Sequence, residues 1–244
     1  MRATAVIEAI AVGGATRYRT LRSDPPLLLR PTPHALQLVG GAAGPLGGDC
    51  LAYEVTVGAG ATLTVRSVAA SMVLPGAGES VLDIAVDVAD GAHLDWDPQP
   101  VISVMASRHV QRTRIRLAPT ATLRWSEALV LGRSGEEPGS LTSVLRVERA
   151  GTVLHHTELR IGADAPGWEG PAGLAGARAV VTEISVGPGD HMTRVVAPAP
   201  GSDEATPARA GVFALAADAS VAVVTAADCV AAGHALSQMA RRPG

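Results

Sequence analysis

The sequence contains no lysine, so all 20 of its basic residues are arginine, and 23 acidic residues give a formal net charge of −3. The one locally basic run is RHVQRTRIR at residues 108–116, whose alternation is typical of the solvated face of a strand. A nucleic-acid surface needs a dense positive field to hold the phosphate backbone. We therefore expect no nucleic-acid partner.

Cysteine is scarce as well. Cys50 and Cys229 lie far apart and form neither a CxxC pair nor a disulfide framework, which favours reduced thiols in a cytosol. Glu8 interrupts the apolar N-terminal stretch, which therefore resembles a strand more than a signal peptide. The most apolar late stretch, residues 212–236, contains two aspartates and does not match a membrane span. We expect a soluble cytoplasmic protein without a membrane segment.

Local enzyme motifs are also missing. The chain has no P-loop, no GxGxxG, no HExxH, no GxSxG and no paired CxxC. Aromatic residues make up 2% of the chain, which is few for a protein that binds sugars by stacking. We expect a protein that is not an enzyme and holds no tightly bound cofactor.

The sequence does contain an internal repeat. Three segments share alternating apolar residues, a three-residue turn and then Ala-x-Leu-x-(Val or Trp): VTVGAGATLTV from Val55, VDVADGAHLDW from Val86 and IRLAPTATLRW from Ile115, at spacings of 31 and 29 residues. Each segment predicts strand, tight turn, strand. The near-constant period predicts units that stack on one another, as in a β-helix or a layered sandwich. We therefore expect an all-β, β-helix-like stack of antiparallel strand-turn-strand units in a single domain over residues 1–244.

Beyond the repeats, residues 144–161 predict a hairpin with Ala150-Gly151 at its turn. Two stretches rich in glycine and proline, residues 163–177 and 187–210, predict loops. Both loops are candidates for partner contact or disorder.

A helix is expected near residues 226–242. Thr225 is the candidate N-cap, and Asp228 follows three residues later in the manner of a capping box. The apolar face that we expect to be buried follows the helical spacing through Val230, Gly233, Leu236 and Met239. Such a helix either covers the core of its own domain or docks onto a partner.

Few residues offer metal-ligand chemistry. His155 and His156 are adjacent, but neighbours on a strand point to opposite faces, so both cannot reach one ion. Asp49 and Cys50 offer a carboxylate and a thiolate for a transient nickel contact, or Cys50 is simply packed. The segment DWDPQP from Asp95 is a proline-locked corner that is either a binding site or the exit of a strand from its layer.

Four segments together resemble the UreD (UreH) family of urease accessory proteins. They are TRYRTLRSDPPLLLR from Thr16, GGDCLAYEVTVGAGATLTVRSVAAS from Gly47, DWDPQP from Asp95 and WSEALVLGR from Trp125. They occur in the family's order and with its separations, and the resemblance covers roughly residues 4–160. It implies a β-helix-like fold.

The resemblance also implies a function in metallocentre assembly. Members are scaffolds that bind apo-urease and UreF, and through which the GTPase UreG delivers nickel along an internal polar passage. The carried-over passage residues are Asp49, Asp95 and Glu127. Their polar neighbours would be Ser67, Ser71, Gln99 and Arg133. Ni²⁺ would be a transient cargo, since oxygen and imidazole ligands hold it loosely enough for release.

Two other functions stay open on the residues alone. One is a β-rich module that binds carbohydrate or protein without catalysis. The other is a hydrolase or lyase that uses Asp95 with Asp97, or Asp83 with Asp87, as an acid/base pair. Raised pKa values for those carboxyls in an open cleft would favour the enzyme.

Overall fold

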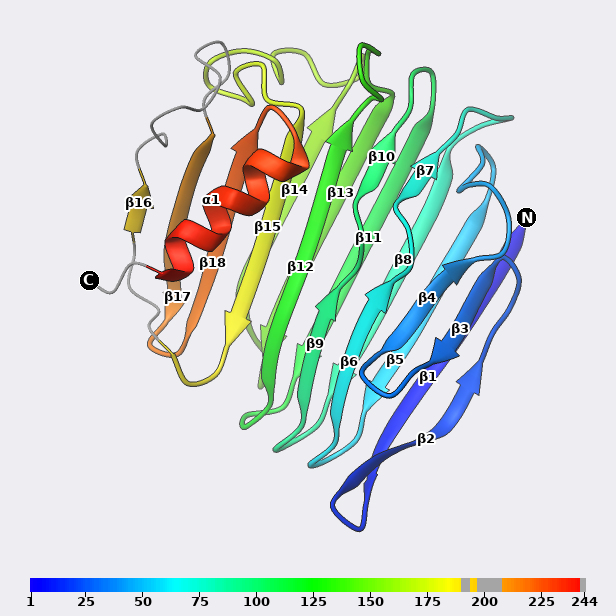
Figure 1. The fold of residues 1–244 in the computed structure, drawn as a ribbon, viewed down its shortest axis with the longest axis vertical. Coiled ribbons are helices and arrows are strands. Elements are labelled where there is room, and N and C mark those ends of the chain that lie inside the picture. The colour runs from blue at the N-terminus through cyan, green and yellow to red at the C-terminus, as the bar shows by residue number, and fades with distance from the viewer. Residues whose placement is uncertain (190–193, 197–207, 242–244) are drawn as a thin grey trace.

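A computed structural model of the chain describes residues 1–189, 194–196 and 208–241, and its strands form two sheets (Figure 1). Sheet A has seven strands in the order β14-β13-β11-β8-β5-β1-β2. These strands are β1 (Arg2–Val12), β2 (Ala15–Arg22), β5 (Cys50–Val57), β8 (Ser80–Val88), β11 (Arg108–Leu117), β13 (Ser140–Arg149) and β14 (Thr152–Ile161).

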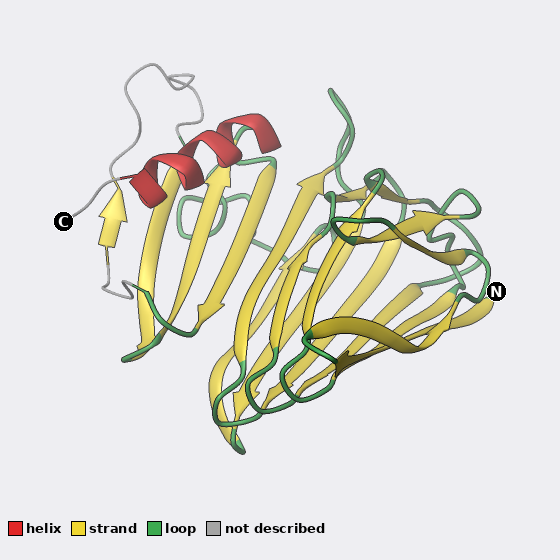
Figure 2. Cartoon of the chain, turned by 60° about the horizontal axis from the view of Figure 1, so that its bottom comes forward, coloured by secondary structure: helices red, strands yellow, loops and turns green. Residues whose placement is uncertain are grey.

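Sheet B has eleven strands, nine of them in the order β16-β17-β18-β15-β12-β9-β6-β4-β3, while β10 pairs with β12 and β7. They are β3 (Leu27–Pro31), β4 (Leu36–Gly40), β6 (Thr62–Ser67), β7 (Ser71–Val73), β9 (His93–Asp97), β10 (Val101–Ser103), β12 (Thr122–Leu131), β15 (Ala179–Val186), β16 (Arg194–Val196), β17 (Arg209–Ala216) and β18 (Ala219–Ala226). The two sheets lie face to face as layers (Figure 2).

The three sequence repeats build the centre of this stack, and the predicted β-helix-like fold is confirmed. In each repeat the first strand belongs to sheet A and the second to sheet B: β5 and β6, β8 and β9, β11 and β12. Equivalent strands of successive repeats pair in parallel, β5 with β8 and β8 with β11 in sheet A, β6 with β9 and β9 with β12 in sheet B. The tight turn therefore carries the chain between the layers, and each repeat is one coil of a solenoid.

The turns between the layers stack as regularly as the strands do. Each is closed by one short-range hydrogen bond, for example from the Ala61 amide to the Gly58 carbonyl at 3.0 Å. Gly60 and Gly91 adopt positive φ at equivalent positions of the first two turns. The third turn has Thr120 there, whose backbone amide and hydroxyl both donate to the Asp90 carboxylate, at 3.1 and 2.8 Å. A side-chain bond thus links neighbouring turns where glycine is missing.

Strand alternation separates the interior from the outer faces. Along β11, one set of alternating residues is buried between the sheets, while the arginines Arg112, Arg114 and Arg116 lie outside. Near the turns the interior is apolar, and it includes Trp96 stacked on Trp125 with ring centroids 4.9 Å apart. Toward the starts of β8 and β11 the inward residues become polar. The interior of one stack thus has an apolar half near the turns. Its other end, which we call the polar half, combines these polar residues with a second apolar cluster that includes Leu129, Leu131 and Leu141.

The predicted hairpin is confirmed as β13 and β14. The two strands pair antiparallel, with Val144 opposite Glu158 and Leu141 opposite Ile161. Ala150 and Gly151 form the turn, and both have positive φ, which suits a tight hairpin turn. Residues 163–177 form the run of turns that follows, and Leu174 from this run is buried against β12 and β13 residues.

Helix α1 (Cys229–Arg241) packs against β15, β17 and β18 on the side of sheet B away from sheet A (Figure 2). Two details of the expected helix are wrong. Thr225 lies inside β18, and the N-cap is Asp228, whose carboxylate accepts from the Ala231 amide at 2.8 Å. The buried face is formed by Ala232, Ala235 and Met239, whereas Val230 and Gly233 are exposed.

Of the two roles expected for this helix, covering its own domain or docking onto a partner, the structure shows the first. In the described part of the chain there is no helix with the length and apolar character needed to cross a membrane. Most of the expected loop at 187–210, and the end of the expected helix at residue 242, lie outside the described residues. Within the described part of that range the expected loop is wrong in two places, because β16 and the start of β17 are strands that pair with each other.

Candidate functional site

Two neighbouring strands of sheet B are each interrupted at the same level of the stack. Strand β6 stops at Ser67 and resumes as β7, and β9 stops at Asp97 and resumes as β10. Ser71 pairs with Val101 beyond the breaks, so β7 and β10 pair with each other again within the sheet. The DWDPQP corner is the second of these breaks. It makes an opening within sheet B and does not carry the strand to another layer.

Behind the breaks lies a cavity of about 280 Å³. Ser67 and Gln99 line it. They also connect the two breaks, because the backbone amide of Gln99 donates a hydrogen bond to the Ser67 hydroxyl at 2.8 Å. Ser71 also lines the cavity, and its amide donates to the Pro100 carbonyl at 2.9 Å. The floor is formed by the stacked indoles together with polar residues from β11 and β12. We call this space the larger cavity.

Glu127 is the acidic group at the bottom of the larger cavity. It is 8% exposed and comes from β12, two residues beyond Trp125 on the same inward face. The Gln111 side-chain amide donates to its Oε2 at 2.9 Å, and the Ser143 hydroxyl donates to its Oε1. Burial raises the pKa of Glu127 above its ordinary value, against the opposing effect of the hydrogen bonds from Ser143 and Gln111.

Glu127 also lines a second cavity of about 160 Å³ on its other side, which we call the smaller cavity. Ser143, His155 and Thr157 contribute polar groups from β13 and β14. Thr182 contributes another from β15, opposite Glu127 in the ladder. One buried carboxylate thus faces two cavities, one behind the breaks of sheet B and one between sheet B and the β13–β14 hairpin.

Asp49 lies at the edge of the larger cavity, just before β5, and is 3% exposed. Its carboxylate accepts from the Met1 ammonium and from the Leu46 amide, the latter at 2.9 Å. Burial alone would raise the pKa of Asp49, but the hydrogen bonds from the ammonium and from Leu46, with the ammonium's charge, hold it below its ordinary value. Asp49 is thus an ionised group that already has partners.

Asp95 and Arg133 lie away from both cavities. Asp95 faces the outside of sheet B, because its neighbour Trp96 points inward, and it forms ion pairs with Arg66 at 2.6 Å and Arg124 at 3.2 Å. Arg133 is exposed and pairs with Glu136 at 2.8 Å. Of the seven residues predicted from the resemblance, the structure therefore brings Asp49, Glu127, Ser67, Ser71 and Gln99 around the larger cavity and leaves the other two outside.

His109, Gln111 and Ser143 were not among the predicted site residues, although all three line a cavity. For His109 and Gln111 a signal was present in the sequence. The arginines of RHVQRTRIR mark one face of the strand as solvated, and His109 and Gln111 alternate with them on the opposite, interior face. His155 faces the interior and His156 the outside, as the alternation predicted.

This geometry does not support the two alternative functions, a carbohydrate-binding module and a hydrolase or lyase with a pair of aspartates. Trp96 and Trp125 are buried in the stack and offer no stacking surface to a sugar. Asp95 has a pKa lowered rather than raised: burial would raise it, but Arg66 and Arg124 outweigh that effect. Asp83 and Asp87 lie on the outer face in ion pairs with Arg112 and Arg116. Within the described residues, no cluster of three metal-binding side chains is present.

Fold and site together define a two-layered β-solenoid scaffold with a polar half that holds a buried carboxylate between two cavities. The family model for the UreD urease accessory protein matches residues 1–243. The chain belongs to the UreD family of urease accessory proteins.

Individual relatives agree with this assignment. The chain is 41% identical over 225 residues to "Urease accessory protein UreD" of Parafrankia sp., covering 81% of this chain and 76% of the relative. It is 45% identical over 197 residues to the protein of that name from Streptomyces avermitilis, covering 77% and 78%. With "Urease accessory protein UreD 1" of Saccharopolyspora erythraea it shares 37% identity over 257 residues, covering 98% and 94%.

Proposed function

We propose that this chain assists urease maturation as a non-catalytic scaffold that gives Ni²⁺ a protein-lined passage through its polar half. The observation that carries the proposal is Glu127, one buried carboxylate that faces both cavities. A cation that leaves water needs a counter-charge and replacement ligands, and a buried carboxylate supplies both. Its neighbours Gln111 and Ser143 hold the carboxylate in place between the two spaces.

The passage in this proposal enters behind the breaks of sheet B and leaves beside the β13–β14 hairpin. Asp49, Ser67, Ser71 and Gln99 line the entry. Asp49 acts there mainly through its negative charge, since its oxygens accept hydrogen bonds from Met1 and Leu46. Weak ligation suits a cargo that has to move on, because a closed set of four strong ligands would retain the ion.

Apo-urease, UreF and UreG are the proposed partners, and the cytoplasm is the proposed place of action, where the free thiols of Cys50 and Cys229 would persist. Val68 and Met72 flank the larger cavity and are 59% and 44% exposed. Exposed apolar side chains at an opening favour a protein partner that covers them. We therefore expect co-expression with UreF to raise the yield and melting temperature of this chain, and unchanged values would contradict the UreF contact.

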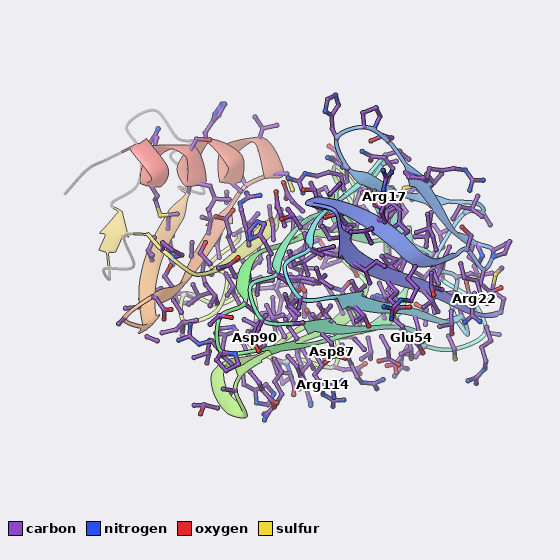
Figure 3. The ribbon with its side chains drawn as sticks, turned by 90° about the horizontal axis from the view of Figure 1, so that it is seen from below. Arg17, Arg22, Glu54, Asp87, Asp90 and Arg114 are labelled. Atoms are coloured by element: carbon purple, nitrogen blue, oxygen red, sulfur yellow. The ribbon has the colours of Figure 1, made fainter. Side chains whose placement is uncertain are left out.

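The passage is tested by Glu127→Gln, which keeps the shape of the side chain and removes its charge. Its amide oxygen can still accept from Gln111, and its NH2 group can donate to the Ser143 hydroxyl, which is able to accept. The matched control is Glu54→Gln, because Glu54 lies exposed on the outer side of sheet A (Figure 3). Each variant is combined with UreF, UreG, apo-urease and Ni²⁺. Pull-down measures assembly, and elemental analysis of the purified urease measures nickel.

We expect Glu127→Gln to assemble normally and to yield nickel-poor urease, while Glu54→Gln behaves like the wild type. Full nickel loading by Glu127→Gln in an intact complex would overturn the passage. Asp49→Ala is a less decisive variant, because it leaves the Leu46 amide without its acceptor and is expected to cost about 1–3 kcal/mol of stability.

A further inference from the structure

His109 is a buried histidine whose second ring nitrogen has no partner. The residue is 2% exposed, and within the described part of the chain its Nε2 has no hydrogen-bond partner. A buried polar atom left unpaired is unfavourable, and such atoms in a folded protein call for a physical explanation. His109 comes from β11 and lines the larger cavity, as do Gln111 and Glu127.

The partners of the other nitrogen assign the tautomer. His109 Nδ1 lies 2.8 Å from the Ser80 hydroxyl, and that hydroxyl donates to the Arg108 carbonyl at 3.2 Å. A hydroxyl has one proton to donate, so Ser80 accepts from Nδ1, which therefore carries the ring proton. Nε2 is then left with a free lone pair. Burial lowers the pKa of His109 to about 4, against a smaller opposing effect from the Ser80 backbone, so the ring is neutral at physiological pH.

A second unpaired imidazole nitrogen lies on the far side of Glu127. The Nε2 of His155 is buried and, among the described residues, has no hydrogen-bond partner. His155 lines the smaller cavity together with Glu127 and Ser143. The order through the polar half is thus an imidazole in the larger cavity, a carboxylate facing both cavities, and an imidazole in the smaller cavity.

We propose that His109 and His155 are ligands for a borderline divalent cation such as Ni²⁺, each binding it through Nε2 and in succession on the two sides of Glu127. The proposal rests on the proposed function for the identity of the cargo. Neutral imidazole suits nickel, copper and zinc, and it competes better with water for these ions than a serine hydroxyl or a glutamine amide does. One imidazole lines each cavity, which gives two weak sites instead of one strong site.

The hydrogen bond from Nδ1 to Ser80 strengthens this assignment. Histidines that bind metals through one nitrogen usually donate a hydrogen bond from the other, which fixes the tautomer and the ring orientation. Ser80 is fully buried and holds His109 in this way from the neighbouring strand β8. Ser80 is a positioning residue in this proposal, and His109 is the ligand.

The test is a nickel titration of the protein labelled with ¹⁵N in its seven histidines. Ni²⁺ is paramagnetic and broadens the signals of a nitrogen that it contacts. Long-range ¹H–¹⁵N spectra resolve Nδ1 and Nε2 of each ring, and they also test the tautomer of His109 directly. His109→Gln and His155→Gln assign the two rings, and Ser80→Ala assigns His109 independently if the first variant does not fold. The outward-facing His156 is the matched control, removed by His156→Gln.

We expect Ni²⁺ to broaden the Nε2 signals of both His109 and His155 in the wild type and in His156→Gln. Broadening confined to exposed histidines such as His34 and His156 would overturn the proposal. The urease assay separates this result from the proposed function. Broadening at both rings, together with unchanged nickel loading of urease by His109→Gln, would contradict the passage and support the two sites. Nickel-poor urease without broadening would contradict the two sites.

Discussion

The apolar and polar halves of the interior are built by the same coils of strands, and they differ in the side chains that these strands point inward. Near the turns, strand rows place apolar residues side by side, as in the row Val65, Trp96, Trp125 and Ile184 across sheet B. Two residues along β12 from Trp125 the inward position is Glu127, and on β11 of the facing sheet A the inward positions are His109 and Gln111. The ladders of sheet A continue through both halves, because backbone pairing does not depend on the side chains. The apolar half can therefore supply the stability, which frees the polar half to carry groups that are costly to bury.

The strongest way to break this comparison is Trp96→Ala in the apolar half. Trp96 is 2% exposed, stacks on Trp125 and meets the edge of Tyr53. We expect the variant to lose about 3–5 kcal/mol of unfolding free energy, measured by urea denaturation. Val230→Ala, at a position 68% exposed on α1, should stay within about 0.5 kcal/mol of the wild type. A loss below about 1 kcal/mol for Trp96→Ala would show that the apolar half does not carry the stability.

In the polar half, Ser143→Ala should have a smaller effect. It removes the hydroxyl that donates to Glu127 Oε1 and leaves a buried carboxylate oxygen without that partner. We expect a loss of about 1–3 kcal/mol in the same assay. The same substitution in a Glu127→Leu background should cost clearly less, since the unpaired oxygen is gone. Equal losses in both backgrounds would mean that the hydrogen bond contributes nothing.

Glu127→Gln should change the pH dependence of stability and leave the fold intact. Burial raises the pKa of Glu127 above its ordinary 4.5, so between these two values the folded state binds more protons than the unfolded state. Wild-type stability should therefore fall relative to the variant as pH rises from 4.5, and the difference should level off above the raised pKa. Urea denaturation of both proteins between pH 4.5 and 8 measures it. A difference that does not vary with pH would contradict the raised pKa.

The smallest effect is expected on the outer face of sheet A. Arg116 donates two hydrogen bonds to Asp87, at 2.5 and 2.7 Å. Asp87 lies on the solvent side of the sheet (Figure 3). Both side chains are about half exposed, so Arg116→Ala should cost about 0.5 kcal/mol or less. The effect should shrink further in 1 M salt. A loss comparable with that of Ser143→Ala would mean that the outer face is not an energetically neutral surface.

Much of the stack could be predicted from the sequence because its signals are local. The repeats specify strand, turn and strand through alternation and turn residues, and Ala150-Gly151 specifies the hairpin. Pairing between repeats is not local. The sequence therefore did not decide that the first and second strands of each repeat belong to different sheets.

The site was harder to predict than the fold. Glu127 and Asp49 were found through family motifs, and alternation alone would have added His109 and Gln111 and placed Asp95 outside beside the inward Trp96. The N-cap of α1 was misplaced because Thr225 is equally suited to a strand, and the strand pairing with β15 decides the matter. Which buried groups face one another across the cavities depends on the packing of the two sheets and has no local signal.

The breaks in β6 and β9 also determine where this chain can change its length. Before the breaks, partners in successive coils are 31 residues apart, as are Arg66 and Asp97. After the breaks the separation is 30, between Ser71 and Val101, and at the next strand it is 29, between Ser80 and His109. Each coil therefore gains or loses residues only in the segments around the polar half, while the tight turns keep one length. Insertions and deletions there would resize the cavities and leave every strand row of the apolar half in register.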